Sequence, residues 1–426
     1  MEYLQGLQCD DQLFSDLIAA LSMVLDVEEE RKLFHGWRVA AVVGLALRAS
    51  GERGLLAEAF YGGLLHDIGA MGLPDHVTHY PTLESQVSVP EILAHPARGA
   101  AIVAEIPGLE GVSPFILEHH EYWDGSGYPA GKKDGDISFG AHLLRAGDAF
   151  DLALRAEVAA GHGTPRDLKD RVLARMSSLK AGELSPAVVE LISAVVEPDS
   201  TFMSLVDVEA LGDLIAELRA RIPLVVPSCK ESPGHTVLTI FSRVIDAKHR
   251  YTAGHSQRVA DYSVAIGLHM GLSPGELEVL EASALLHDTG KVSVPRSILD
   301  KSGPLTPAEL ALIRRHASLT IEILGTISRF EGIAWVAGHH HERYDGGGYP
   351  HGLRGDEIPL GARIIAVADA FDAMTSSRPY QKTYTAGEAM RVLAREAGRQ
   401  FDPDVIEAAV HALKPSLVAQ ALSSRG

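Results

Sequence analysis

Residues 339–350 read HHHERYDGGGYP, and they join two chemical features around which the rest of the chain is organised. Adjacent imidazoles come first, and neutral imidazole is the commonest protein ligand for metal ions. Three glycines then precede Tyr349 and Pro350, and backbone without a Cβ can approach a bound molecule closely. On its own, the segment could equally be a histidine-rich surface turn. The rest of the chain must decide between the two.

Most of the pattern occurs twice. Matching segments stand in the two halves of the chain: HHEYWDGSGYPAG (119–131) and HHERYDGGGYPHG (340–352), LLHDIGAMGLP (64–74) and LLHDTGKVSVP (285–295), and HGWRVA from residue 35 and HSQRVA from residue 255. Their spacing agrees as well, since 29 residues separate each of two pairs: His66 from His95, and His287 from His316. Repetition of motifs and spacing indicates a tandem duplication.

The duplication predicts three parts of the chain: residues 1–195 as an N-terminal copy, 196–228 as a helical connector, and 229–426 as a C-terminal copy. A segment with prolines and few periodic positions, residues 221–234, marks the end of the connector. Before it, VEALGDLIAELRARI predicts a helix that bridges the two halves or packs between them.

The predicted fold class is all-α, because Ala, Leu and Glu recur at helical spacing and helix start signals are frequent. Three segments have a Ser or Thr at N-cap and a Glu three residues later, the capping-box pattern: Ser273–Glu276, Thr306–Glu309 and Thr385–Glu388. We therefore expect two tandem helical domains.

Composition limits the class of partner. The 426 residues are 46% hydrophobic and 22% charged, as in ordinary globular proteins. A net charge of −18 argues against a nucleic-acid duplex, which needs a basic face. The sequence shows no membrane-spanning run and no signal peptide, and Cys9 and Cys229 fit neither a disulfide framework nor a zinc motif. The cytoplasm is the expected location.

The repeated motifs supply metal-binding side chains. In the C-terminal copy the candidates are His255, His287, Asp288, His316, His340, His341 and Asp369. Their counterparts in the N-terminal copy are His35, His66, Asp67, His95, His119, His120 and Asp148. A set of imidazoles and carboxylates without thiolates favours iron or manganese. Seven ligands suit two divalent ions that share a bridge, which we assign to Asp288.

These motifs together resemble the HD-GYP branch of the HD superfamily of metal-dependent phosphohydrolases. The similarity rests on H-x-x-R-V-A, H-D-x-G-K, the isolated histidine, H-H-E-x-x-D-G-x-G-Y-P and the DAFDAMTSSRPY segment. It is close over about 235–415 and looser over about 15–195. The resemblance implies a helical domain with two or three iron or manganese ions. It also implies hydrolysis of cyclic di-GMP to pGpG and GMP, or of the mixed cyclic GMP–AMP dinucleotide.

The same resemblance implies roles for single residues. Lys291 would act with Asp288 in catalysis and point at the phosphate. The residues that would hold the dinucleotide are Gly348, Tyr349, Pro350, Arg378 and, less directly, Lys382. Lys382 stands one position after the family's basic residue, where this chain has Gln381.

Two departures from the family pattern refine the expectation. Some members have a third metal ligand, a Glu, where this chain has Tyr251, which favours a dinuclear centre. The N-terminal copy has Ala70 in place of Lys291 and no Arg-Pro-Tyr segment. We expect that copy to bind metal, to be weak or silent in catalysis, and to be able to regulate activity or hold a homodimer together.

Two other functions remain open from the sequence. A cyclic-dinucleotide receptor would need no catalysis, but Lys291 and the complete ligand set argue against it. A phosphohydrolase of another nucleotide would not need the Gly-Tyr-Pro turn.

Overall fold

The computed structural model describes most of the chain: residues 11–28, 31–32, 34–71, 73, 77–161, 164–222, 233–247, 254–301, 303–327, 329–376 and 383–413. Over these ranges the predicted all-α class is confirmed, and strands are limited to the paired β1 (Val27–Glu28) and β2 (Arg31–Lys32). No helix in the described ranges combines the length and the apolar character needed to span a membrane.

The chain forms two compact units, which divide between Thr236 and Val237. The helices that precede this point are α1 (Asp11–Leu25), α2 (His35–Ser50), η1 (Arg53–Leu55), α3 (Leu56–Leu65), η2 (Ile68–Ala70), η3 (Val77–His79), α4 (Leu83–Val87), α5 (Pro90–Ala104), η4 (Glu110–Val112), α6 (Ser113–Glu118), η5 (Asp134–Asp136), α7 (Phe139–Ala159), α8 (Pro165–Ser178), α9 (Pro186–Val196), α10 (Asp199–Val206) and α11 (Val208–Arg221).

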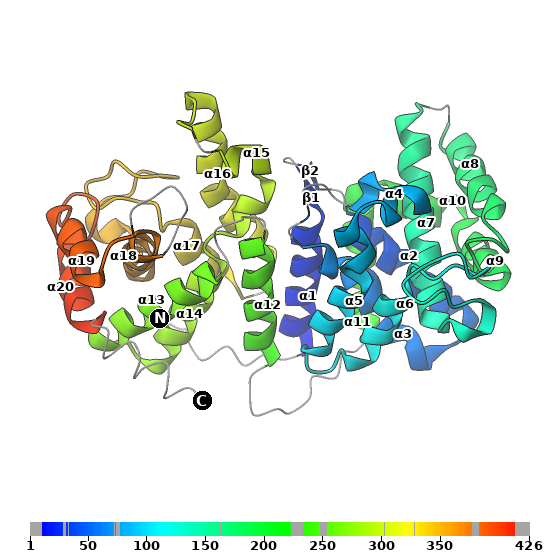
Figure 1. Cartoon of the computed structure of the whole chain (residues 1–426), viewed down its shortest axis with the longest axis horizontal. Helices are drawn as coiled ribbons and strands as arrows, with labels where there is room; N and C mark the ends of the chain where they lie inside the picture. The colour runs from blue at the N-terminus through cyan, green and yellow to red at the C-terminus, as the bar shows by residue number, and fades with distance from the viewer. Residues whose placement is uncertain are drawn as a thin grey trace. The chain divides into compact units, whose positions relative to one another are not determined.

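The remaining helices lie in the C-terminal unit, except that the first residues of α12 precede the division (Figure 1). They are α12 (Pro233–Ala247), α13 (His255–His269), α14 (Pro274–Leu286), η6 (Thr289–Ser293), α15 (Arg296–Leu299), α16 (Pro307–Leu324), α17 (Glu331–Gly338), η7 (Gly355–Glu357), α18 (Leu360–Thr375), α19 (Ala386–Arg395) and α20 (Pro403–Ala412).

The predicted helix starts are present. Ser273, Thr306 and Thr385 each accept a hydrogen bond from the backbone N–H three residues later, and the Glu side chain there accepts one from the N-cap backbone N–H. Each capping box satisfies two backbone donors that a helix start leaves unpaired. The local signals in the sequence therefore placed α14, α16 and α19 correctly.

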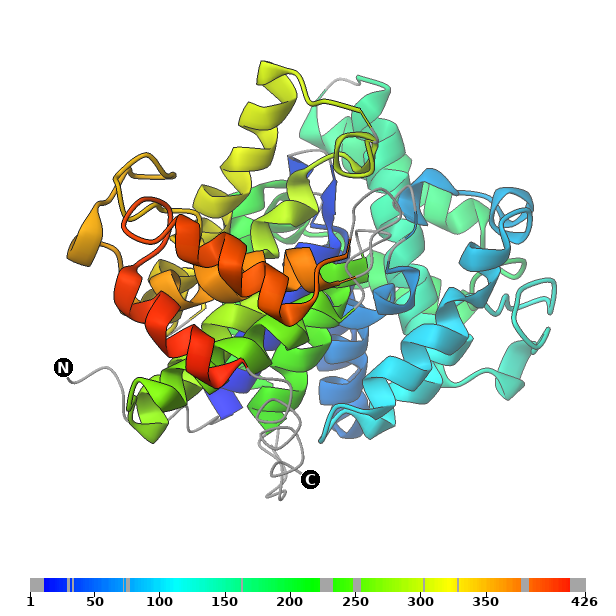
Figure 2. The ribbon, with the colours of Figure 1, turned by 60° about the vertical axis from the view of Figure 1, so that its left-hand side comes forward.

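Corresponding helices pack alike in the two units. In the N-terminal unit α2 contacts α3, α7 and α9, and in the C-terminal unit α13 contacts α14, α18 and α20. The short α19 and α20 lie side by side in both ribbon views (Figure 2). Each unit thus places one central helix beside the elements that carry the histidine motifs.

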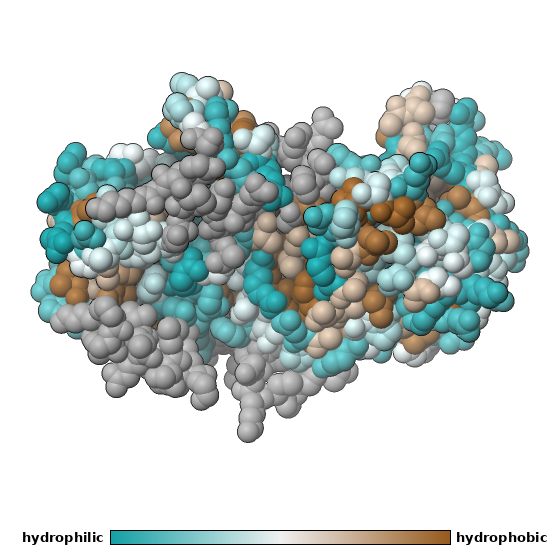
Figure 3. All heavy atoms as spheres, in the orientation of Figure 1, coloured by the Kyte–Doolittle hydropathy of each residue, from teal (hydrophilic) through white to brown (hydrophobic). Residues whose placement is uncertain are grey.

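The helix predicted within the connector is present as α11. It packs on α2 and on α10, so both helices belong to the N-terminal unit. Apolar side chains of these helices are buried, among them Phe202, Leu211, Ile215 and Leu218. On the face drawn in Figure 3, hydrophilic and intermediate residues cover most of the described surface, and hydrophobic residues form smaller areas.

Candidate metal centre

The C-terminal unit brings all seven of its predicted ligands together. Three overlapping groups have donor atoms within 4.8 Å of one another: His255, His287 and Asp288; His287, His340 and Asp369; and His316, His340 and His341. They come from the start of α13, the end of α14, the middle of α16, the end of α17 and the middle of α18. The helical frame therefore converges on one site.

Asp288 lies at the middle of this site, and its two oxygens face different histidines. Oδ2 is 3.4 Å from His287 Nε2, whereas Oδ1 is 3.7 Å from His316 Nε2 and 3.8 Å from His340 Nε2. Asp369 Oδ1 lies 3.4 Å from His255 Nε2. A carboxylate with one oxygen toward each group of imidazoles has the geometry of a bridging ligand.

The imidazole rings are held from behind by the backbone. Nδ1 of His287 is 2.7 Å from the Ala284 carbonyl, and Nδ1 of His340 is 2.7 Å from the Ala337 carbonyl. His316 makes the same contact one helical turn back. Because a carbonyl can only accept, Nδ1 carries a proton, and Nε2 is the nitrogen that faces the centre. Metal-binding histidines are usually oriented in this way.

His255 is oriented by a carboxylate that the sequence interpretation missed. Its Nδ1 lies 2.7 Å from Asp372 Oδ2, and Arg258 Nε donates to Asp372 Oδ1 at 2.6 Å. In the N-terminal unit, Asp151 holds His35 and Arg38 in the same way. The signal was in the repeats, because H-x-x-R and D-x-x-D recur and a three-residue spacing places both members on one helix face.

Two positions require glycine because another part of the backbone lies too close for a side chain. A Cβ on Gly290 would stand 2.0 Å from the His316 carbonyl oxygen, so the glycine of H-D-x-G lets α16 approach the end of α14. A Cβ on Gly348 would stand 2.3 Å from the Arg343 nitrogen. Glu342 also stabilises this turn by accepting from the backbone N–H groups of His351 and Gly352.

Burial sets the charge of the ligands. It lowers the pKa of His316 to about 4, and together with the charge of His316 it lowers the pKa of His341 to about 3. Burial acts in the same direction on His287, but the charge and hydrogen bond of Asp288 outweigh it and raise the pKa of His287 to about 9. Burial opposes ionisation of Asp288, yet His287 and Lys291 hold its pKa well below its ordinary value. The site thus combines two neutral imidazoles, those of His316 and His341, with an ion pair between His287 and Asp288.

The donor atoms fit metal ions. Several buried atoms in this site make no hydrogen bond, although buried polar atoms normally do: His287 Nε2, His316 Nε2, His340 Nε2 and Asp288 Oδ1. These are the atoms that point at the centre. Nitrogen and oxygen donors without sulfur suit iron or manganese.

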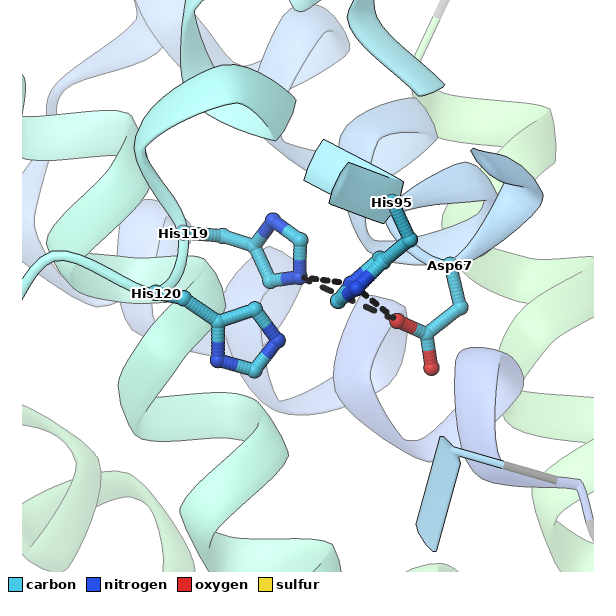
Figure 4. A group of neighbouring side chains, drawn as sticks. All are labelled: Asp67, His95, His119 and His120. Carbon is cyan, nitrogen blue, oxygen red and sulfur yellow. Dashed lines mark hydrogen bonds and ion pairs between the residues drawn. The ribbon is translucent and has the colours of Figure 1, made fainter. Parts of the chain in front are cut away.

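The N-terminal unit repeats the arrangement with its own seven residues. Asp67 Oδ2 is 3.3 Å from His66 Nε2, and Asp67 Oδ1 is 3.3 Å from His95 Nε2. Figure 4 shows the ring nitrogens of His95 and His119 directed at each other, 3.2 Å apart, with His120 beside them. Both rings donate Nδ1–H to backbone carbonyls, so their Nε2 atoms are the ones that face each other, as ligands of one shared ion would.

A pocket opens beside the C-terminal centre. Its volume is about 280 Å³, and its lining includes Arg314, His341, Arg343, Gly348, Tyr349, Ala366, Asp369 and Gln400. The Arg314 guanidinium lies over the Tyr349 ring, 5.3 Å from the ring centroid. Lys291 Nζ is 2.5 Å from Asp288 Oδ2. The pocket therefore joins the ligand cluster to the glycine turn.

Some predicted residues cannot be placed. Arg378, Lys382 and Tyr251 lie outside the described residues, so their contacts and the prediction of a dinuclear rather than trinuclear centre stay open. Pro350 is described and follows Tyr349 in the turn. Arg314 and Arg343, which the sequence left as either surface or site residues, both line the pocket.

Comparisons with known proteins agree with this geometry. The HD domain family profile matches residues 13–170 and 239–405. The chain is 33% identical over 319 residues to the 3'3'-cGAMP-specific phosphodiesterase 3 of Vibrio cholerae, a match that covers 74% of this chain and 66% of that protein. It is 42% identical over 173 residues to the cyclic di-GMP phosphodiesterase response regulator RpfG of Xanthomonas campestris, a match that covers 40% of this chain and 46% of that protein.

A solved structure shares the fold of both units. It is described as a crystal structure of the cyclic GMP-AMP phosphodiesterase V-cGAP3 of V. cholerae, with a TM-score of 0.66 and 25% identity. The match covers 95% of this chain and 98% of that one. The chain therefore belongs to the HD domain family, in its HD-GYP branch, with two HD regions in tandem.

Proposed function

We propose that the C-terminal unit is a metal-dependent phosphodiesterase that hydrolyses a cyclic dinucleotide, either cyclic di-GMP or 3'3'-cGAMP. One observation carries the proposal: Asp288 lies between two groups of histidines, and a pocket with the Gly-Tyr-Pro turn in its wall opens beside them. The relatives that the chain matches are named for these two substrates.

The seven residues of the C-terminal centre would hold two divalent ions, with iron or manganese as the best fit. When bound, such ions supply Lewis acidity and lower the pKa of bound water. Their donor atoms form three overlapping groups: His255, His287 and Asp288; His287, His340 and Asp369; and His316, His340 and His341. The protein keeps these donors oriented and largely buried, so little structural reorganisation is needed on binding, and a bound cation would displace the proton of His287.

Other side chains would hold the substrate. The chain carries a net charge of −18, so an anionic dinucleotide needs local cations. Arg314 and Arg343 line the pocket, and Lys291 stands at the bridging carboxylate. Gly348 allows the turn to approach closely, and Tyr349 presents a half-buried ring on which a base can stack.

The reaction adds water across a P–O bond and opens the cyclic dinucleotide. In this proposal Lys291 orients the bridging carboxylate and stabilises the negative charge that develops on the phosphate. Preorganised cations in a partly dry site act strongly on such charge. The complete ligand set with Lys291 argues against a receptor without catalysis.

The direct test is anaerobic purification of the full chain, metal analysis and an assay with each dinucleotide. We expect about two metal ions in the C-terminal unit and release of a linear dinucleotide. The ratio of kcat/KM for cyclic di-GMP and 3'3'-cGAMP then assigns the substrate. A metal-loaded chain that binds both dinucleotides without hydrolysing either would support the receptor alternative instead.

A further inference from the structure

The lining of the C-terminal pocket differs from the equivalent N-terminal residues at five positions: Arg314, Arg343, Gly347, Ala366 and Gln400 correspond to Leu93, Tyr122, Ser126, Arg145 and Glu183. Three of these N-terminal residues, Arg145, Glu183 and Tyr122, lie together. Arg145 and Ala366 each stand three residues before the equivalent aspartates, Asp148 and Asp369. Ala366 lines the C-terminal pocket, and its short side chain leaves space there. The larger side chain of Arg145 therefore occupies the corresponding position in the N-terminal unit.

Two other positions change together with this one. Backbone hydrogen bonds identify Glu183 as the counterpart of Gln400, because Trp123 N donates to the Glu183 carbonyl as Tyr344 N donates to the Gln400 carbonyl, both at 3.2 Å. Tyr122 follows His119-His120-Glu121 as Arg343 follows His340-His341-Glu342 in the other unit. Both Gln400 and Arg343 line the C-terminal pocket.

The three N-terminal residues contact one another. Arg145 Nε donates to Glu183 Oε1 at 2.8 Å, and the guanidinium lies 5.4 Å from the centroid of the Tyr122 ring. Arg145 also donates to Asp148 through Nη1. Its side chain is 3% exposed, so the guanidinium itself is closed to solvent.

The residues next to Arg145 are also more buried than their counterparts in the C-terminal unit. The Asp148 side chain is 8% exposed, whereas that of Asp369 is 24% exposed. Tyr128 is buried, and its hydroxyl donates to Gln86 Oε1 at 3.1 Å. Its counterpart Tyr349 is half-buried. The face of the centre that is accessible in the C-terminal unit is covered in the N-terminal unit.

We propose that Arg145 is an internal plug, held between Asp148, Glu183 and Tyr122, that closes the N-terminal metal site to cyclic dinucleotides. The guanidinium occupies the place of the substrate and bonds one oxygen of Asp148. The other oxygen of Asp148 lies 3.6 Å from His35 Nε2 and stays directed at the metal site. This inference rests on the proposed function, because it takes the C-terminal pocket to be the substrate pocket.

The plug accounts for a difference in accessibility between the two metal sites that the metal ligands cannot explain. Both units keep the same seven ligand types, so the ligand set predicts two similar sites. The sites differ in where their cations lie: Lys291 stands on the bridging aspartate in the C-terminal unit, and Arg145 stands on the aspartate of α7 in the N-terminal unit. The first position leaves the pocket open, and the second fills it.

The first experiment moves the plug into the open pocket. Ala366→Arg is made in the full chain, loaded with Mn²⁺ and assayed with both dinucleotides. We expect turnover to fall by about a hundredfold or more, because the substrate no longer reaches its productive position, while Mn²⁺ content is unchanged. Ala308→Arg, which adds the same side chain at an exposed position of α16, is the control and keeps turnover within about threefold of the wild type. A chain with Ala366→Arg that turns over both substrates at the wild-type rate overturns the proposal.

The second experiment removes the plug. Arg145→Ala with Glu183→Gln gives the N-terminal unit the alanine and the glutamine of the open pocket without leaving Glu183 as an unpaired carboxylate. The variant is made in a chain with His287→Ala and Asp288→Ala, so that metal bound by the C-terminal centre does not contribute to the measurement. Two readouts are used: affinity for cyclic di-GMP and 3'3'-cGAMP by equilibrium dialysis, and the water-proton relaxivity of bound Mn²⁺.

We expect at least about a tenfold gain in affinity for one dinucleotide and a higher relaxivity, since an open site lets water reach the ion. The control pair is Lys180→Ala with Glu190→Gln, which removes a surface ion pair and changes neither value. A folded variant that shows neither gain overturns the plug. If the variant fails to fold, the Ala366→Arg experiment still tests the proposal. The relaxivity measurement needs no dinucleotide, so it tests the plug even if the wild type hydrolyses neither substrate. Absence of hydrolysis by the wild type would refute the proposed function and leave the plug to be decided by relaxivity.

Discussion

Lys291 Nζ lies 2.5 Å from Asp288 Oδ2, and the equivalent position beside Asp67 is Ala70. In the C-terminal unit one oxygen of the bridging carboxylate therefore faces both His287 and an ammonium group. The oxygens of Asp67 instead face imidazole nitrogens, those of His66 and His95 at 3.3 Å. The two units thus share a ligand frame and differ in the charge beside it.

This relationship predicts the effect of Lys291→Ala. The ligands remain, so metal content should be close to the wild type, while kcat should fall by about a hundred- to a thousandfold. Metal analysis and steady-state kinetics on the same preparation check both parts. Lys301→Ala, which removes a cation paired with Glu309 on the surface, is the matched control and keeps kcat. Loss of metal from the Lys291 variant would mean that the lysine acts through the ligand frame instead.

Asp372→Asn tests the residue that orients His255. The carboxylate is 1% exposed and accepts from both His255 and Arg258, so an amide there loses the charge and one acceptor. Substitution of such supporting residues typically lowers metal affinity by about ten- to a hundredfold. Competition with a chelator measures the shift.

The equivalent substitution in the other unit, Asp151→Asn, should weaken metal binding only there and leave hydrolysis largely intact. If both variants lost hydrolysis equally while folded, the two centres would be functionally coupled.

Glu309 gives a pH dependence that can be checked without substrate. Lys301, and then the backbone of Thr306, lower the pKa of Glu309 to about 2 from an ordinary value of 4.5. A carboxylate with a lowered folded-state pKa stabilises the fold above its unfolded pKa, and this contribution is lost as pH falls through the folded value. The difference in thermal stability between wild type and Glu309→Gln should therefore be constant above about pH 5 and shrink toward pH 2. A difference that stays constant down to pH 2 would contradict this.

Local signals in the sequence predicted much of the fold. The capping boxes at Ser273, Thr306 and Thr385 depend on residues within one helical turn, so they can be recognised without tertiary structure. The ligands were predictable because the duplication repeats their spacing. The Arg145 plug was not, since it depends on contacts with Tyr122 and Glu183, which lie 23 and 38 residues away along the chain. The residues that fill a pocket depend on how distant elements pack together, and the spacing of motifs in the sequence does not predict that packing.

Asp288→Ala tests whether one carboxylate joins the two halves of the centre. Its two oxygens face separate groups of histidines, so its removal takes a ligand from both. We expect loss of both metal ions from the C-terminal unit and of all hydrolysis above background. Metal analysis should be compared with Asp369→Ala, which removes a carboxylate from one side of the centre. Full turnover by the Asp288 variant would refute a bridged dinuclear mechanism.

The last prediction concerns the division of labour between the units. Both have a ligand frame, but only the C-terminal one combines Lys291 with a pocket that Ala366 leaves open. Replacing His287 and Asp288 with alanine should abolish hydrolysis, because the active centre loses two ligands, one of them the bridge. Replacing His66 and Asp67 should leave most of it, apart from losses through stability, which thermal unfolding of each variant measures. The assignment of the active unit would be reversed if a folded His66–Asp67 variant lost hydrolysis while the His287–Asp288 variant kept it. Lys291 would then stand beside a catalytically inactive centre.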